Sequence, residues 1–190
     1  MLGRFVVSAL AALMLCVAAP AAHAATVSLI DPRGDVHRPS AEGYERVEGE
    51  RRTDIVRTTI RHKKHAVVAR IKLLDLRREP GLMVMAMRMR TNDGTYREAG
   101  VEASRRIGWR GRSDVEARNG RAVDCAALQH EIDYRTDVIA LRVPRSCLNR
   151  PRWVQATVIQ FWLGSRQMLI DNPHNSRGGF NVWTRRLHRG

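Results

Sequence analysis

Hydrophobic and polar residues alternate along much of the chain, which is the pattern of strands that bury one face. In residues 65–76, HAVVARIKLLDL, the apolar face consists of Val67, Ala69, Ile71 and Leu73. Residues 53–62, TDIVRTTIRH, repeat this pattern, and the side chains expected to point inward are Val56, Thr58 and Ile60. Lys63 and Lys64 then form the turn of a hairpin that joins the two strands.

Residues 82–103 predict a second pair of strands. Methionines at alternate positions, Met83, Met85, Met87 and Met89, form one face of the first strand and are expected in the core. The sequence Asn92-Asp93-Gly94 predicts a turn, and the second strand follows it.

The rest of the chain predicts further strands. Residues 137–143 alternate again, whereas residues 153–163 are apolar on both faces, as in a central strand covered from both sides. The composition of residues 171–179 predicts a loop before a last strand in residues 180–187. No segment has a helical period with caps, so we expect an all-β fold, a single-domain β-sandwich that is jelly-roll-like.

The first residues predict a secretory leader. An apolar run from Phe5 to Ala19 precedes Ala22-His23-Ala24, a small-x-small cleavage signal. We expect residues 1–24 to be a signal peptide and residues 25–190 to be the β-sandwich, secreted and associated with the cell wall. A retained membrane anchor is the alternative, but the run is short and Pro20 interrupts it. We expect no membrane span in the mature chain, because no later stretch is apolar enough.

The chain is strongly basic, with a formal net charge of +14. Residues 138–190 hold nine arginines and one acid, a net charge of +8, which favours polyanions such as wall polymers, anionic lipid heads or nucleic acid. No specific nucleic-acid motif is present, and codon bias with solubility is the other explanation. The arginines expected to bind anions are Arg142, Arg145, Arg150, Arg152, Arg185, Arg186 and Arg189.

Two cysteines remain after the predicted leader, Cys125 and Cys147. An even pair in an exported chain predicts a disulfide, with a pair of buried thiols as the alternative. Closing a loop of about 20 residues would stabilise the fold by roughly 3 kcal/mol in the loop-entropy treatment.

The segment Asp31-Pro32-Arg33-Gly34-Asp35 predicts a turn after the first strand. The alternative is a hard-cation site, because Ca²⁺ takes carboxylate and carbonyl oxygens. Asp31 and Asp35 are then the candidate ligands, with Asp54, Asp75 or Asp171 brought near by the fold. Adhesion through Arg33-Gly34-Asp35 is a third interpretation. We therefore expect no cofactor, and a structural Ca²⁺ remains the alternative.

Two other residue patterns have structural explanations. His62-Lys63-Lys64-His65 resembles a zinc pair, but two lysines oppose a cation, so exposed turn histidines are expected. Each of Trp109, Trp153 and Trp183 lies next to or near an arginine. Core packing is expected for these rings, and stacking on sugar rings or bases is the alternative.

Catalysis has little support in the sequence. Neither Gly-x-Ser-x-Gly nor His-Glu-x-x-His occurs, and the cysteines suit a disulfide better than a nucleophile. We expect no enzyme and assign no catalytic residue.

Several short motifs together resemble a known group of proteins. They are Asp31-Pro32-x-Gly34-Asp35, Asp54-Ile55, Asp75-Leu76, Cys125, Val143-Pro144-Arg145-Ser146-Cys147-Leu148, Pro151 and Trp183-Thr184. This layout resembles uncharacterised small secreted proteins of high-GC Gram-positive bacteria. The resemblance implies a β-sandwich similar to family-9-type carbohydrate-binding modules, with a Cys125–Cys147 bridge and with Asp31 and Asp35 as calcium candidates. The sugar-stacking tryptophans of those modules have no positional match here.

Three functional hypotheses follow from the sequence. The first is an exported, non-enzymatic β-sandwich that associates with an anionic or glycan polymer of the cell surface. The second is an accessory or inhibitor module that binds a protein partner. The third is a wall-acting hydrolase, which needs carboxylates that converge in a cleft.

Overall fold

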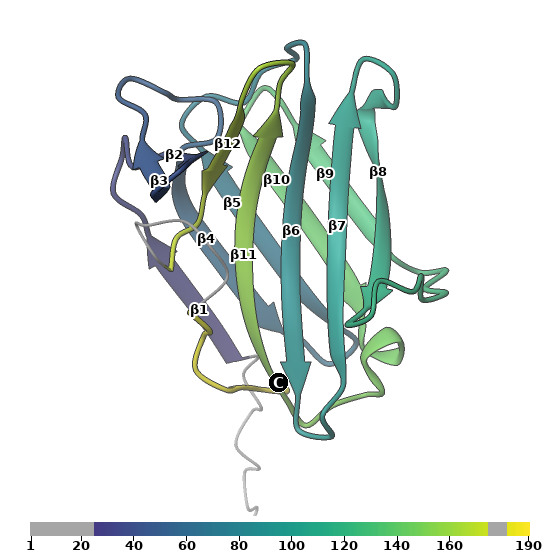
Figure 1. Cartoon of the computed structure of the whole chain (residues 1–190). Coiled ribbons are helices and arrows are strands. Elements are labelled where there is room, and N and C mark those ends of the chain that lie inside the picture. The colour runs from purple at the N-terminus through teal and green to yellow at the C-terminus, as the bar shows by residue number, and fades with distance from the viewer. Residues whose placement is uncertain (1–24, 175–181) are drawn as a thin grey trace, which may run out of the picture.

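Two antiparallel sheets pack face to face in the computed structural model, which describes residues 25–174 and 182–190 (Figure 1). The predicted leader, residues 1–24, lies outside the described residues. The five-stranded sheet has the order β1 (Ala25–Ile30), β4 (Ile55–His62), β5 (Ala66–Leu73), β10 (Val138–Pro144), β9 (Gln129–Asp133). The all-β sandwich predicted from the alternating patterns is therefore confirmed.

The second sheet has eight strands. Its order is β3 (Gly43–Arg46), β2 (His37–Ser40), β12 (Met168–Asp171), β11 (Trp153–Leu163), β6 (Leu82–Thr91), β7 (Tyr96–Ser104), β8 (Gly108–Ala117), and β13 (Leu187–His188) also pairs with β11. A short 3₁₀ helix, η1 (Arg145–Leu148), follows β10. No helix in the described ranges is long and apolar enough to cross a membrane.

The core lies between the two sheets and comes from the inward positions of the alternating strands. The four methionines of β6 are at most 7% exposed and belong to the same core cluster as buried residues of β5 and β10, which confirms their predicted place in the core. The inward residues of β5 are Val67, Ala69, Ile71 and Leu73. The strand β11 is a central strand of its sheet, as predicted for residues 153–163, because it pairs with β6 on one side and with β12 and β13 on the other.

The hairpin of β4 and β5 has the predicted turn, but one of the three residues predicted to point inward does not. The backbone N–H of Lys63 donates to the carbonyl of Ala66 at 2.8 Å and closes the turn. A register shift between Ile55 and Arg57 places Ile55 fully inside, whereas Val56 is only half-buried. The expectation that Val56 is an inward residue of a regular strand is therefore wrong, because the bulge adds one residue to β4.

Two boundaries near the C-terminus also differ from the prediction. Residues 168–171 form β12, so Asp171 ends a strand instead of opening a loop. The predicted last strand, residues 180–187, lies partly outside the described residues, and the strand that the structure describes is Leu187–His188.

The predicted disulfide between Cys125 and Cys147 is confirmed, with Cα atoms 5.7 Å apart. The bridge attaches η1 to the segment before β9. It thereby ties η1, which follows β10 of the five-stranded sheet, to the connection from β8 to β9, where the N–H of Val123 donates to the carbonyl of Val115 in β8 at 2.8 Å.

Candidate functional site

Buried carboxylates gather at one edge of the sandwich, where β1, β2, β4 and β12 meet (Figure 1). Asp31 and Asp35 lie in the connection from β1 to β2, and Asp171 is the last residue of β12. One ligand oxygen from each of the three lies within 4.8 Å of those of the other two. The fold thus brings together the two predicted ligands and a residue about 140 positions away. We call Asp31, Asp35, Asp171 and the neighbouring Asp54 the acidic cluster.

Two backbone hydrogen bonds hold the acidic cluster in place. The carboxylate of Asp171 accepts the N–H of Ile55 at 2.7 Å, and the carboxylate of Asp54 accepts the N–H of Gly34 at 2.7 Å. Gly34 has a φ of +74°, which favours glycine at this position of the turn. The turn predicted for the Asp31–Asp35 segment is therefore tied to β4, and β4 is tied to β12.

Burial and mutual repulsion change the acidity of the acidic cluster. Burial, followed by the charges of Asp31 and its neighbours, raises the pKa of Asp171 to about 9. Burial, followed by the charges of Asp35 and Asp54, raises the pKa of Asp31 to about 8. The pKa values of Asp35 and Asp54 are also raised, chiefly by burial. The protein alone therefore disfavours four negative charges at this edge.

Asp75, a third residue considered as a possible cation ligand, serves another purpose. Its carboxylate pairs with the guanidinium of Arg77, with 2.5 Å between Asp75 Oδ2 and the nearest nitrogen. It is not part of the group of acids that approach one another at the edge.

Three segments that carry basic residues meet at a different place, the end of the sandwich near the C-terminus (lower end of Figure 1). The β4–β5 turn, the η1 segment and the strand β13 meet there, although they are far apart in the sequence. We call the following residues the basic end: Lys63, Lys64, Arg145, Arg150, Arg152, Arg185, Arg186 and Arg189.

Hydrogen bonds join the segments of the basic end. The guanidinium of Arg145 donates to the carbonyl of Lys64 at 3.2 Å and to that of Arg150 at 2.9 Å. The N–H of Arg189 donates to the carbonyl of Arg152 at 3.1 Å. Burial, and then the charges of Arg189 and Arg150, lower the pKa of Arg145. Arg145 thus holds the end together, whereas Arg150, Arg152 and Arg189 are exposed.

Two further members of the basic end have identified contacts. Arg185 donates to the carbonyl of Thr26 at 3.3 Å, and the guanidinium of Arg186 lies 4.7 Å from the ring centre of Trp153. Trp153 is half-buried beneath this guanidinium. It is therefore covered by an arginine and is not a bare stacking platform.

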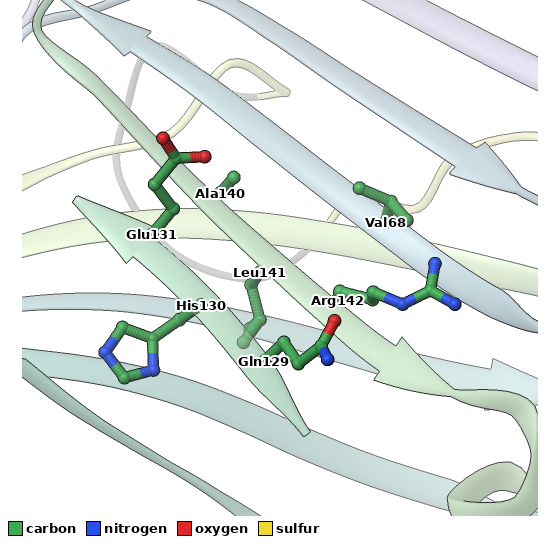
Figure 2. Close-up of a pocket in the computed structure, with 7 residues that line it drawn as sticks. All are labelled: Val68, Gln129, His130, Glu131, Ala140, Leu141 and Arg142. Atoms are coloured by element: carbon green, nitrogen blue, oxygen red, sulfur yellow. The ribbon is translucent and has the colours of Figure 1, made fainter. Parts of the chain in front are cut away.

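The seventh predicted arginine, Arg142, lies on the outer face of the five-stranded sheet. It pairs with Val68 of β5, and Arg61 of β4 pairs with the same residue from the other side. The two arginines are thus two strand spacings apart, about 10 Å. Two hollows of about 220 Å³ each share Val68 and Ala140 in their lining, and Figure 2 shows Arg142 beside one of them.

The basic end differs from the other charged surfaces in its lack of acidic partners. Ion pairs occur elsewhere in the sandwich, for example between Arg88 and Glu98 at 2.8 Å and between Arg112 and Glu102 at 2.9 Å. Within the described ranges, no member of the basic end forms an ion pair. One acid lies nearby, Asp93 in the β6–β7 turn, whose neighbour Asn92 accepts the N–H of Arg152 at 2.6 Å. The local charge is therefore strongly positive.

The sequence-based prediction is wrong for one histidine near the basic end, and it did not include three basic residues that lie there. His62 is fully buried, and its Nδ1 lies 2.8 Å from the carbonyl of Leu187, so the expectation of an exposed turn histidine is wrong for it. His65 is exposed, as expected. Lys63, Lys64 and Arg61 belong beside the predicted arginines, but only the strand order places them there.

No protein-family model, curated protein or solved structure matches the chain. The fold therefore defines the class to which the chain belongs: an all-β sandwich of two antiparallel sheets with one disulfide. The resemblance to secreted bacterial proteins and to carbohydrate-binding modules remains an expectation.

Proposed function

We propose that the chain is an exported, non-enzymatic binding module that holds an anionic polymer of the cell surface on its basic end. The observation that carries the proposal is the gathering of eight basic side chains from three distant segments on one end of the sandwich. A concentration of like charge without acidic partners costs stability, so a binding role accounts for it better than solubility alone.

The chemistry of the basic end suits a chain of repeated anionic groups. Six of its eight residues are arginines, whose planar guanidinium groups bind phosphate and carboxylate through two parallel N–H bonds. The exposed members belong to the β4–β5 turn, the η1 segment and the β13 region, so the surface is wider than a single anion. A phosphate-rich or uronate-rich wall polymer fits this spread of charge.

On the outer face of the five-stranded sheet, the strands β4, β5 and β10 extend the same positive surface, whereas β9 adds the acid Glu131. Arg61, Arg70 and Arg142 surround Val68, and the three make no ion pair within the described ranges. Since Lys63 lies two residues beyond Arg61, this face continues into the basic end. A long polymer could therefore bind along the face as well as across the end.

Co-sedimentation with purified cell walls tests the proposal. We expect the purified chain to bind at low salt and to dissociate at high salt, because salt screens exposed charges beyond about 10 Å at 0.1 M. The double variant Arg150→Glu, Arg189→Glu should bind several-fold less, since both residues enter the described hydrogen bonds only through backbone groups.

A matched control keeps the net charge the same. Arg105→Glu with Arg106→Glu changes two exposed arginines in the β7–β8 turn, at the opposite end of the sandwich (Figure 1). This control should bind like the unchanged chain. Equal loss in both double variants would mean that only net charge matters and would contradict a site at the basic end. Binding that survives high salt would favour neutral sugar recognition.

A protein partner is the second candidate, and one observation favours it. Ile30 is 76% exposed at the end of β1, which is an edge strand of the five-stranded sheet. An exposed edge with an apolar side chain can accept a strand from another protein. Ile30→Lys should abolish such pairing and leave wall binding unchanged.

A further inference from the structure

The acidic cluster contains buried carboxylate oxygens that the protein itself does not satisfy. Both oxygens of Asp35, Oδ2 of Asp31 and Oδ1 of Asp54 are buried without a hydrogen-bond partner. Asp35 is only 6% exposed and Asp54 is fully buried. A buried polar atom without a partner is rare and costly, and several converging ones call for a ligand.

Neighbouring basic residues form no ion pair with the acidic cluster in the described part of the chain, although the charges of His37 and Arg46 act on Asp35. Arg33, Arg46 and Arg51 act on the acidic cluster only as charges at longer range. The Nε of Arg46 donates to the carbonyl of Gly34, and Arg33 and Arg51 are exposed. None of the three forms an ion pair with the cluster in the described part of the chain.

We propose that Asp31, Asp35 and Asp171 bind one Ca²⁺ ion. Their ligand oxygens lie within 4.8 Å of one another, which is the separation that one ion can span with oxygens at about 2.4 Å. Asp54 is a positioning residue, because its bond to the N–H of Gly34 fixes the turn that carries Asp31 and Asp35.

The donor set favours calcium over other ions. It offers only carboxylate oxygens, which suit hard cations and not zinc or copper. Mg²⁺ keeps several of its water molecules and is seldom held by an all-protein cage, whereas Ca²⁺ accepts six to eight irregular oxygen ligands. An open hollow of about 310 Å³ lies beside the cluster, and its lining includes Asp54 and Glu50 as well as Arg33 and Arg51.

The position of the site gives the ion a structural role. Asp31 and Asp35 belong to the connection that passes from β1 in one sheet to β2 in the other. Asp171 ends β12, in the same sheet as β2. An ion bound to all three therefore clamps the two sheets together at this edge and relieves the repulsion among the buried acids. Its binding free energy adds to the stability of the fold.

Calcium titration of the chelator-treated chain tests the proposal. We expect isothermal titration calorimetry to give one ion per chain. Ca²⁺ at about 100 times its dissociation constant should raise the unfolding temperature by about 5–10 °C. The same concentration of Mg²⁺ should raise it much less. No binding heat and no thermal shift with Ca²⁺ would overturn the proposal, and an equal or larger response to Mg²⁺ would overturn the choice of ion.

Asp35→Asn separates ion binding from a general effect on folding. The variant removes a ligand charge at nearly constant size, so in chelator it should unfold at the same or a higher temperature than the unchanged chain. In Ca²⁺ it should lose most of the thermal shift. The control Asp124→Asn changes an exposed acid and should keep the full shift. A full calcium shift in Asp35→Asn would contradict the assigned ligand set. Wall binding by the basic end can fail without affecting any of these outcomes.

Discussion

The carboxylate of Asp171 accepts the backbone N–H of Ile55 at 2.7 Å, although the two residues are 116 positions apart. This bond joins the end of β12 in one sheet to the start of β4 in the other. Both groups are buried, so neither can exchange its partner for water without opening the edge of the sandwich. The same carboxylate thus has a role in the fold besides its place in the acidic cluster.

A pair of substitutions at Asp171 should separate these two roles. Asp171→Asn and Asp171→Ala both remove the carboxyl group, but only the amide keeps an oxygen that can accept the N–H of Ile55. We expect Asp171→Ala to be less stable than Asp171→Asn by about 1–3 kcal/mol, the cost of a buried donor without a partner. Urea unfolding in excess chelator measures the difference. Equal stabilities would show that the Ile55 bond contributes nothing to the fold.

His62 should make the fold sensitive to acid. Burial is the largest cause that lowers its pKa below the ordinary value of 6.5, and the charges of Arg145, Arg189 and His188 act in the same direction. The bond between Nδ1 and the carbonyl of Leu187 opposes these effects only in part. The unfolded chain therefore takes up the proton at a higher pH than the folded chain does.

The sign of the pH effect follows from this difference. Above pH 6.5 His62 is neutral in both the folded and the unfolded chain, so its full contribution to the free energy of unfolding is present. As the pH falls from 6.5 towards the lowered pKa of the folded state, stability is lost by up to about 1.4 kcal/mol per pH unit. His62→Asn keeps a donor near Nδ1 and should lack this loss. Urea unfolding at several pH values, with calcium held constant, compares the two chains, and parallel curves would contradict the prediction.

Removal of the disulfide should destabilise the fold without unfolding it at room temperature. Cys125 and Cys147 are 22 positions apart, and a bridge across such a loop contributes about 3 kcal/mol through loop-closure entropy. A reductant should therefore lower the urea midpoint of the unchanged chain. The double variant Cys125→Ala, Cys147→Ala should start from the lower midpoint and show no response to reductant. A response of the double variant would point to an effect of the reductant elsewhere.

The sequence predicted the strands that depend only on local alternation. Residues 65–76 and the methionines of β6 have a strict period of two, and their inward faces form the core as expected. The bulge at Ile55 was not predictable, because it changes the register by one residue without any glycine or proline to mark it. The strand β12 was missed because Asp171 precedes Asn172 and Pro173, which are residues typical of loops.

The candidate sites depend on strand order, which the sequence does not contain. Asp31 and Asp35 became candidate cation ligands because both lie in one turn, but the choice among Asp54, Asp75 and Asp171 needed the pairing of β12 with β2. The basic end shows the same dependence. Lys64 lies next to Arg145 only because β5 pairs with β10, and β10 leads into η1.

Two glycines in similar backbone conformations should respond differently to substitution by alanine. Gly111 and Gly120 have φ values of +76° and +75°, so a side chain at either position meets the cost of the left-handed region, about 1–2 kcal/mol. A Cβ at Gly120 would meet nothing within 4 Å. A Cβ at Gly111 would lie 2.7 Å from the carbonyl oxygen of Glu102 and 2.8 Å from Cδ1 of Ile132. We expect Gly111→Ala to cost at least about 1 kcal/mol more than Gly120→Ala, because β8 must move away from its neighbours. Urea unfolding of the two variants at one pH measures this difference. Equal losses would mean that the backbone conformation alone determines the cost and that the approach of β8 to Glu102 and Ile132 is easily relaxed.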